Sequence, residues 1–334
     1  MQGLKGLATG AGSMPQKEAS AAVDLIFKYC PAIPFWPQLP KINPNEGMIA
    51  QFSGNIPIEK PTDQDLEKFY EELIKGDVEY FRINEDVASG LYAFKKRLKE
   101  QPKLLDAVKF IKGQITGPFT FAASAKDISG SALLHDPISM QVIIKGLMMK
   151  ALWQVQFFKE FGKRMVIFID EPYLGCFGSA YTPLNREDVV KGLTELAEGI
   201  KSKDVLIGVH CCGNTDWSIF TEVKAIDIIN FDAFSFLDKF VLYADSLKGF
   251  LERDGVICWG VVPTQEFQGT ENARELVKKV EEGMDVLEKK GVARSVLQEN
   301  MLLSPSCGLG TLDEAKATAI LTLLQQTSQE IQQK

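Results

Sequence analysis

Short apolar runs alternate with longer helical segments along most of this chain, and this alternation constrains its fold more than any other feature. Residues 165–169 and 205–209 are runs of the kind that form a strand buried on both faces of a sheet. We expect eight strands, at residues 4–8, 78–83, 107–113, 165–169, 205–209, 225–231, 256–262 and 300–304. Strands that alternate with helices over this length predict an α/β fold, a single (β/α)8 TIM barrel rather than an open sheet.

A proline-rich stretch near the N-terminus interrupts this pattern. Residues 31–40 contain four prolines, which lack a backbone N–H and exclude regular structure. The same stretch contains Phe35 and Trp36, which are poor residues to leave in water. We therefore predict an ordered, proline-rich N-terminal loop. Because no linker rich in glycine, serine or proline divides the rest, we expect one domain over residues 1–334.

One predicted strand ends in side chains typical of metal ligands. His210 and Cys212 are two residues apart, so they point to one face of the strand, and Cys211 points to the other. Cys307 closes another short apolar run and is followed by a glycine. Imidazole and thiolate are typical zinc ligands, and a barrel gathers its strand ends, so we predict a zinc site of His210, Cys212 and Cys307. The alternative is that the cysteines are small buried apolar residues.

Further polar residues follow other predicted strands. Asp232 could be a fourth, displaceable oxygen ligand, an acceptor for His210, or only a capping or solvated carboxylate. Asp170 and Glu171 are adjacent, so one of them should face the barrel mouth, where it could bind an ammonium group, and the other may be structural. Ser13 lies in a glycine turn and could bind a substrate carboxylate, or it could serve the turn alone. We take Ser13, Asp170 and Glu171 as candidate substrate-binding residues.

Charge and hydropathy restrict the class of partner. The net charge of -7 argues against nucleic acid or an anionic membrane as the main partner. No stretch of 18 residues is free of charge, and the first residues lack the apolar core of a signal peptide. We expect a cytoplasmic protein whose six cysteines are reduced thiols or metal ligands, and whose partner is a small molecule or a protein.

The predicted ligand set suggests a reaction. Two thiolates and one imidazole leave a fourth zinc position that can accept a thiol. Zinc lowers the pKa of that thiol, so that it is a nucleophilic thiolate at neutral pH. Methyl transfer to sulfur needs this nucleophile. A zinc site of this kind therefore fits methyl transfer to a small thiol.

Five motifs, taken in order, resemble the carboxyl-terminal catalytic domain of cobalamin-independent methionine synthase. They are Thr9-Gly-Ala-Gly-Ser-Met-Pro15, Gln114-Ile-Thr-Gly-Pro118, Ile169-Asp-Glu-Pro172, Val209-His-Cys-Cys212 and Ser306-Cys-Gly-Leu309. The resemblance spans nearly the whole chain. It implies a TIM barrel of the superfamily that also holds uroporphyrinogen decarboxylase and the zinc-dependent corrinoid:thiol methyltransferases.

The resemblance also implies roles for particular residues. It implies zinc ligation by His210, Cys212 and Cys307, and contacts of Ser13 and Asp170 with homocysteine, which the family converts to methionine. The family's remaining zinc ligand is a glutamate on the strand after the His-x-Cys motif. The nearest carboxylate in this sequence is the shorter Asp232.

Departures from the family concern the methyl donor. The family's pterin-stacking tryptophan falls at Ser124, its proton-donating histidine near Gln265 and its pterin-binding glutamate at Cys176. The full-length enzyme also has an amino-terminal barrel for which this chain has no room. A neutral amine leaving group needs such an acid, whereas a methylcorrinoid does not. The sequence therefore favours a methylcorrinoid donor, carried by a corrinoid protein partner, over methyl-tetrahydrofolate.

Two other functions fit the same predicted fold. A decarboxylase or a tetrapyrrole-binding protein related to uroporphyrinogen decarboxylase needs basic residues at the barrel mouth, for which Arg82 and Arg186 are isolated candidates. A structural or regulatory barrel would use zinc only for stability. Exchange of a zinc ligand for thiol separates this last possibility from an enzyme.

Overall fold

The computed structural model of the protein describes residues 3–58, 61–126, 130–179 and 184–334. In these residues seven parallel strands form one curled sheet, a half-barrel, in the order β1-β7-β6-β5-β4-β3-β2. The strands are β1 (Leu7–Ala8), β2 (Phe110–Thr116), β3 (Arg164–Asp170), β4 (Val205–Cys211), β5 (Ile228–Phe231), β6 (Val256–Val262) and β7 (Met301–Pro305). The protein is therefore an α/β protein with a parallel sheet, as the alternating pattern predicts.

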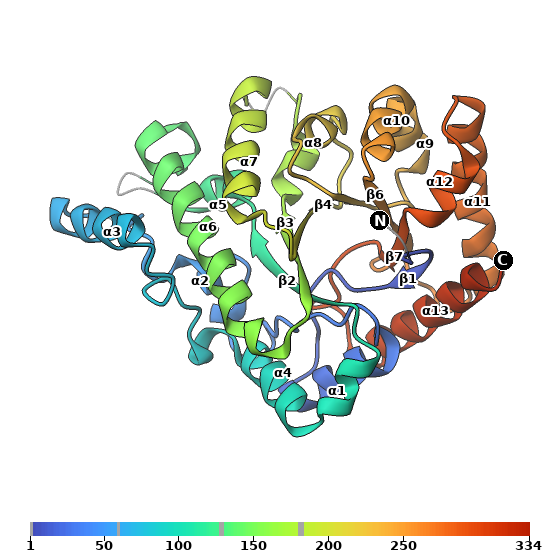
Figure 1. The fold of residues 1–334 in the computed structure, drawn as a ribbon, viewed down its shortest axis with the longest axis horizontal. Coiled ribbons are helices and arrows are strands. Elements are labelled where there is room, and N and C mark those ends of the chain that lie inside the picture. The colour runs from blue at the N-terminus through green and yellow to red at the C-terminus, as the bar shows by residue number, and fades with distance from the viewer. Residues whose placement is uncertain (1–2, 59–60, 127–129, 180–183) are drawn as a thin grey trace.

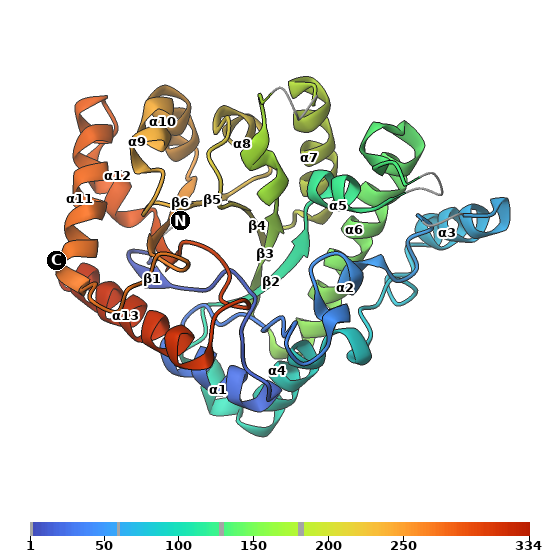
Figure 2. The ribbon, with the colours of Figure 1, turned by 180° about the vertical axis from the view of Figure 1, so that it is seen from behind.

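Helices surround the sheet on its outer side, as Figures 1 and 2 show from opposite directions. They are α1 (Ala19–Tyr29), α2 (Ala50–Ser53), α3 (Asp63–Lys75), α4 (Ser89–Glu100), α5 (Pro118–Ser124), α6 (Pro137–Phe158), α7 (Arg186–Ile200), α8 (Ser218–Glu222), α9 (Leu237–Phe240), α10 (Ala244–Glu252), α11 (Ala273–Lys289), α12 (Arg294–Glu299) and α13 (Glu314–Gln332). Short 3-10 helices lie at Pro44–Glu46, Glu85–Val87, Pro102–Asp106, Leu133–His135, Lys159–Phe161, Pro172–Cys176 and Val241–Tyr243. Helix α3 projects from the body of the molecule (Figure 1).

The two faces of the sheet carry different sets of side chains because neighbouring residues of a strand point in opposite directions. On β3, Ile167 packs with the helices in the larger core, whereas Val166 and Phe168 belong to a second apolar cluster. This second cluster draws its other strand residues from alternate positions of β2, β4, β5, β6 and β7, and so fills the concave face. Polar residues at the carboxyl ends of the strands lie above it on the same face.

The structure corrects the predicted number of strands. Residues 78–83 form turns, in which the N–H of Phe81 bonds to the Val78 carbonyl and that of Arg82 to the Glu79 carbonyl, each at 3.1 Å. These local bonds follow helix α3, whose C-cap residue, Gly76, has a φ of 69°. The prediction of a strand here was wrong because local turn bonds take the backbone groups that a sheet would pair. The described residues thus contain seven of the eight predicted strands.

The proline-rich residues 31–40 lie between β2 and the glycine loop that follows β1. The N–H of Lys112 on β2 bonds to the Pro34 carbonyl at 2.9 Å, and the N–H of Gln38 bonds to the Gly12 carbonyl at 3.1 Å. Phe35 and Trp36 are buried. These contacts hold the glycine loop near β2, and both segments contribute walls to the cavity described below.

Helix α6 is the longest helix of the described residues, and much of it packs in the core. No helix of the described part of the chain has the length and hydropathy to cross a membrane. Lys150 of helix α6 is 1% exposed, and its ammonium donates to the Phe81 carbonyl at 3.4 Å. Burial lowers the pKa of Lys150 to about 7. A cation in this position is stabilised poorly by its surroundings.

Replacing Lys150 with methionine is expected to raise the free energy of unfolding by at least about 1 kcal/mol at pH 7. Because the pKa falls from its ordinary value of 10.5 to about 7 on folding, the unfolded chain binds more protons between these pH values. Wild-type stability therefore rises over this window, and the advantage of the variant shrinks. Urea unfolding at pH 7 and near pH 10 measures both effects.

The control is Lys145→Met on the same helix, which removes a lysine paired with Glu195 at 2.7 Å. This variant should not be more stable than the wild type. A gain for Lys150→Met that stays constant from pH 7 to pH 10 would contradict the assignment of a depressed pKa.

Candidate metal centre

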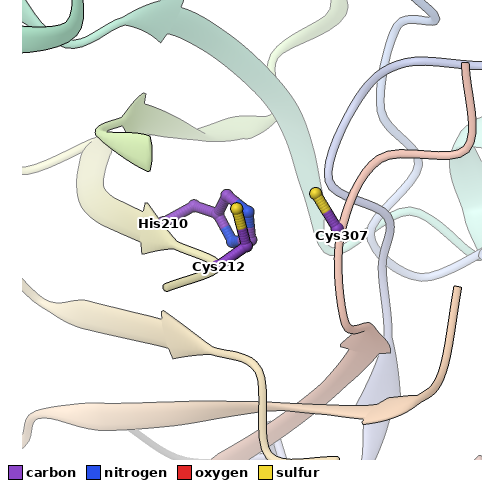
Figure 3. A group of neighbouring side chains, drawn as sticks. All are labelled: His210, Cys212 and Cys307. Atoms are coloured by element: carbon purple, nitrogen blue, oxygen red, sulfur yellow. The ribbon is translucent and has the colours of Figure 1, made fainter. Parts of the chain in front are cut away.

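Three predicted ligands meet at the carboxyl ends of β4 and β7. His210 lies on the concave face of β4, Cys212 follows that strand, and Cys307 follows β7. One ligand atom from each of the three residues lies within 4.8 Å of the others (Figure 3). Cys211 points the other way and is buried in the helix-facing core. The alternation of side chains along β4 thus separates the two adjacent cysteines, as the sequence predicts.

The three side chains fit a zinc ion by donor type and spacing. Zinc in proteins is bound tetrahedrally by imidazole nitrogen and thiolate sulfur, with bonds of about 2.0–2.3 Å, so its ligand atoms lie roughly 3.5 Å apart. Ligand atoms within 4.8 Å of one another need only a small closure to reach this geometry. A catalytic zinc site typically has three protein ligands and one position open to substrate. In the described residues this is the one group of three such side chains at ligand spacing.

Asn230 on β5 fixes the protonation of His210. Its side-chain oxygen lies 2.6 Å from Nδ1 of His210, while its Nδ2 donates to the Cys258 carbonyl at 2.9 Å and to Oγ of Ser304 at 2.8 Å. Because a carbonyl can only accept, the Asn230 amide has one possible orientation, and Nδ1 of His210 must carry the hydrogen. Nε2 is then free to bind a metal.

Sequence reasoning missed Asn230. It lies in an otherwise apolar strand, which is an unusual place for an amide. The register of the sheet places it directly beside His210 on the neighbouring strand. An asparagine in an apolar strand could have marked Asn230 as a functional residue. Its partner, His210, can be identified only once the register of the sheet is known.

The electrostatics of the cluster favour loss of one thiol proton. The pKa of Cys307 is lowered by the hydrogen bond from the Cys212 thiol and, against the effect of burial, by His210. The pKa of Cys212 is raised by the Cys307 thiolate and by burial. Burial alone would lower the pKa of His210, but the hydrogen bond and charge of Cys307 outweigh burial and raise it. The cluster therefore favours a thiolate at Cys307, and thiolate is the form that zinc binds.

The structure places Asp232 outside this cluster. Asp232 follows β5, and its Oδ1 accepts the backbone N–H of Ser235 at 2.8 Å. It is absent from the group of described residues at ligand spacing. This hydrogen bond favours the capping alternative for Asp232, and the prediction that it is a displaceable ligand gains no support from the described residues. The role of acceptor for His210 belongs to Asn230.

The structure also separates Asp170 from Glu171. Glu171 is fully buried and accepts hydrogen bonds from the N–H of Phe119 at 3.0 Å and from the N–H and hydroxyl of Thr120 at 2.9 and 2.7 Å. Both carboxylate oxygens thus bind the first turn of α5, where a negative charge is favourable. These bonds favour the structural role for Glu171, and its prediction as a substrate contact gains no support from the described residues.

Asp170 instead lines a cavity of about 330 Å³ beside the cluster. Burial raises the pKa of Asp170 to about 6, and the charges of Lys112 and His210 limit the rise. One of its carboxylate oxygens, Oδ1, is buried without a hydrogen-bond partner. The cavity walls include Gly12, Ser13, Met48, Phe52, Gln114, Thr116, Pro172, His210, Cys212, Gln265 and Cys307. Its volume suits a small molecule that reaches the cluster.

Ser13 connects the glycine loop after β1 to the segment that carries Cys307. Its carbonyl accepts the N–H of Leu309 at 2.9 Å, and its Oγ accepts the N–H of Gly310 at 3.2 Å. A Cβ at Gly308 would lie 2.2 Å from Oγ of Ser13, so only glycine permits this approach. Ser13 therefore lies on the cavity wall and also positions the Cys307 segment.

Replacing Ser13 with alanine is expected to lower the free energy of unfolding by about 0.5–1.5 kcal/mol, because one hydrogen bond is lost. Zinc should remain bound with one equivalent, since all three ligands are retained. Homocysteine should bind about tenfold more weakly if the hydroxyl donates to its carboxylate. Urea unfolding, metal analysis and calorimetry measure the three quantities. Unchanged homocysteine affinity would limit Ser13 to its structural role.

Among the residues that the structure describes, the two arginines considered for a tetrapyrrole site do not line this cavity. Arg186 pairs with Glu222 at 2.7 Å and Asp216 at 3.5 Å, and Arg82 donates to Asn84 at 2.7 Å. Neither arginine is among the cavity walls. The decarboxylase alternative is therefore not favoured.

Comparison with known proteins identifies a family for this chain. Residues 85–330 match the family described as "Cobalamin-independent synthase, Catalytic domain". A methionine synthase of Methanocaldococcus jannaschii is 28% identical over 205 residues, which are 60% of this chain and 59% of that protein. This chain thus spans about three fifths of that relative. A solved B12-independent methionine synthase from Shewanella sp. W3-18-1, in complex with selenomethionine, has 16% identity and a TM-score of 0.46 over 71% of this chain and 67% of that one.

The family match also bears on the methyl donor. A cobalamin-independent family argues against the methylcorrinoid donor and the corrinoid protein partner that the sequence favoured. That prediction depended on missing folate contacts, an argument from absent residues. Together, the match over 85–330 and the ordered motifs place this protein in the family of cobalamin-independent methionine synthase catalytic domains.

Proposed function

We propose that the protein is a zinc-dependent S-methyltransferase that converts homocysteine to methionine. The observation that carries the proposal is the meeting of His210, Cys212 and Cys307 on the wall of a cavity that is also lined by Asp170. Zinc bound there would lower the pKa of an incoming thiol and so supply a thiolate at neutral pH. We further propose that residues 1–334 form one domain, because the Ser328 hydroxyl near the C-terminus donates to the Gly6 carbonyl at 2.6 Å.

The residues of the chain have separate tasks in this proposal. His210, Cys212 and Cys307 would hold the metal, and Asn230 keeps the hydrogen on Nδ1 of His210. Asp170 binds the ammonium group of homocysteine, and Ser13 its carboxylate. The cavity positions the thiol sulfur next to the cluster and limits water, which favours in-line attack on the methyl group. The methyl group then passes from the donor to the sulfur, and the demethylated donor leaves with the bonding electron pair.

Methyl-tetrahydrofolate is the donor that the cobalamin-independent family favours. The folate amine needs a proton as it leaves. The cavity wall carries Gln265 at the place where the resemblance puts the family's histidine, and its Nε2 donates to Oγ1 of Thr311 at 3.1 Å. An amide does not supply a proton, so water or another group must do so, and a slow reaction with folate is expected.

The test is to incubate zinc-loaded protein with homocysteine and, in separate reactions, methyl-tetrahydrofolate or methylcobalamin. Methionine, measured by mass spectrometry, is the expected product with methyl-tetrahydrofolate, and the methylcobalamin reaction is the comparison against which the family match argues. Zinc bound without methionine from methyl-tetrahydrofolate, and without exchange of a ligand for thiol, would instead indicate a structural zinc site. Protein that binds no zinc would remove the proposal.

A further inference from the structure

Two residues that line the cavity each have a side-chain oxygen that is buried without a hydrogen-bond partner. These oxygens are Oδ1 of Asp170 and Oε1 of Gln114. Gln114 is 2% exposed, and it lies on β2, next to β3, which ends in Asp170. Buried polar atoms are rarely left unpaired in a folded protein, and each such atom needs an explanation. A ligand that donates hydrogen bonds into the cavity would explain both.

The position of the Gln114 oxygen is fixed by its surroundings. Nε2 of Gln114 donates to the carbonyl of Trp36 at 3.2 Å, and because that carbonyl can only accept, the amide cannot be reversed. The Trp36 indole donates to Oε1 of Gln154 at 2.9 Å, and Nε2 of Gln154 donates to the Gln114 carbonyl at 2.9 Å. These bonds hold both the side-chain amide and the backbone carbonyl of Gln114 in place. The side-chain oxygen is thus a preorganised acceptor.

The two residues also lie on the same face of the sheet. Gln114 pairs in register with Phe168, two residues before Asp170, and Thr116 pairs with Asp170 itself. Side chains two residues apart share a face, so Gln114 and Asp170 are diagonal neighbours on the concave face. Lys112, the buried cation nearby, already donates to the Ala11 carbonyl at 2.7 Å. Oε1 of Gln114 and Oδ1 of Asp170 are therefore two unpaired acceptors in neighbouring residues of the same cavity wall.

We propose that Gln114 determines substrate specificity by binding the α-ammonium group of the thiol substrate together with Asp170. An ammonium group has three donors and no acceptor, which matches a carboxylate oxygen beside a fixed amide oxygen. The inference rests on the proposed function and deepens it. It predicts that the substrates are thiols with a free amino group, and that thiols with a neutral or anionic group in this place bind weakly.

The test compares homocysteine with 4-mercaptobutyrate, which has the same thiol and carboxylate but lacks the amino group. Calorimetry on zinc-loaded wild-type protein and on Gln114→Met needs no methyl donor. The wild type should bind homocysteine at least about tenfold more tightly than 4-mercaptobutyrate. Gln114→Met should lose about tenfold in homocysteine affinity and leave 4-mercaptobutyrate affinity within about twofold. In turnover, the KM for homocysteine should rise more than kcat falls.

Zinc content and thermal unfolding show whether Gln114→Met is folded, and Gln114→Asn, which keeps the amide but withdraws its oxygen, provides a second variant. Equal wild-type affinity for both thiols would overturn the inference, and methionine formation would then leave the proposed function standing. Equal losses for both thiols in Gln114→Met would also overturn it, because they indicate a structural role. Binding of neither thiol to zinc-loaded wild type would remove the proposed function and the inference with it.

Discussion

Replacing Cys307 with serine is expected to lower zinc affinity by more than about a hundredfold and methyl transfer below detection. Loss of a residue that only orients a ligand typically costs 10–100-fold in metal affinity, and Cys307 is one of three candidate ligands itself. A serine hydroxyl stays protonated at neutral pH and is a poor zinc ligand compared with a thiolate. Competition with a chromophoric chelator measures the affinity, and metal analysis the stoichiometry.

The matched control is Cys176→Ser, which makes the same chemical change at an exposed cysteine outside the cluster. It should retain one equivalent of zinc with unchanged affinity. Tight stoichiometric zinc in Cys307→Ser would show that the metal is held elsewhere. Zinc loss in both variants would point to a general effect on folding.

Replacing Asn230 with leucine is expected to lower zinc affinity by about 10–100-fold, although Asn230 does not touch the metal. The change leaves Nδ1–H of His210 without an acceptor and removes the donor to the Cys258 carbonyl and the Ser304 hydroxyl. Each buried group left unpaired costs about 1–3 kcal/mol, so the free energy of unfolding should fall as well. Chelator competition and urea unfolding measure the two effects separately.

The variant Asn230→Asp separates the contribution of Asn230 to zinc affinity from its contribution to stability. Aspartate keeps an acceptor for Nδ1–H of His210, so zinc affinity should stay within about tenfold of wild type. It cannot donate to the Cys258 carbonyl, so stability should still fall. Equal zinc affinity in the wild type and in Asn230→Leu would contradict the role of Asn230 in orienting His210.

Sequence reasoning predicted what depends on local pattern. The two-residue spacing of His210 and Cys212 determines that they share a face, whatever the register of the strand. Cys307 closes an apolar run, and a curled parallel sheet brings strand ends together. The structure brings these three residues together for those reasons.

What the sequence did not predict depends on contacts between distant segments. Asn230 becomes meaningful only when the register places it beside His210. Glu171 and Asp170 differ in their contacts because Glu171 binds the start of α5, some fifty residues earlier in the chain. Residues 78–83 have the apolar content of a weak strand, but local turn bonds satisfy their backbone. Gln114 has no local signal, because its role depends on Trp36 and Asp170 together.

X-ray absorption at the zinc edge, recorded on zinc-loaded protein before and after addition of homocysteine, tests the central claim most directly. We predict a zinc ion bound by one imidazole nitrogen and two sulfurs from the protein, and one additional sulfur once homocysteine is present. Zinc without sulfur ligands, or a spectrum that homocysteine leaves unchanged, would contradict the account.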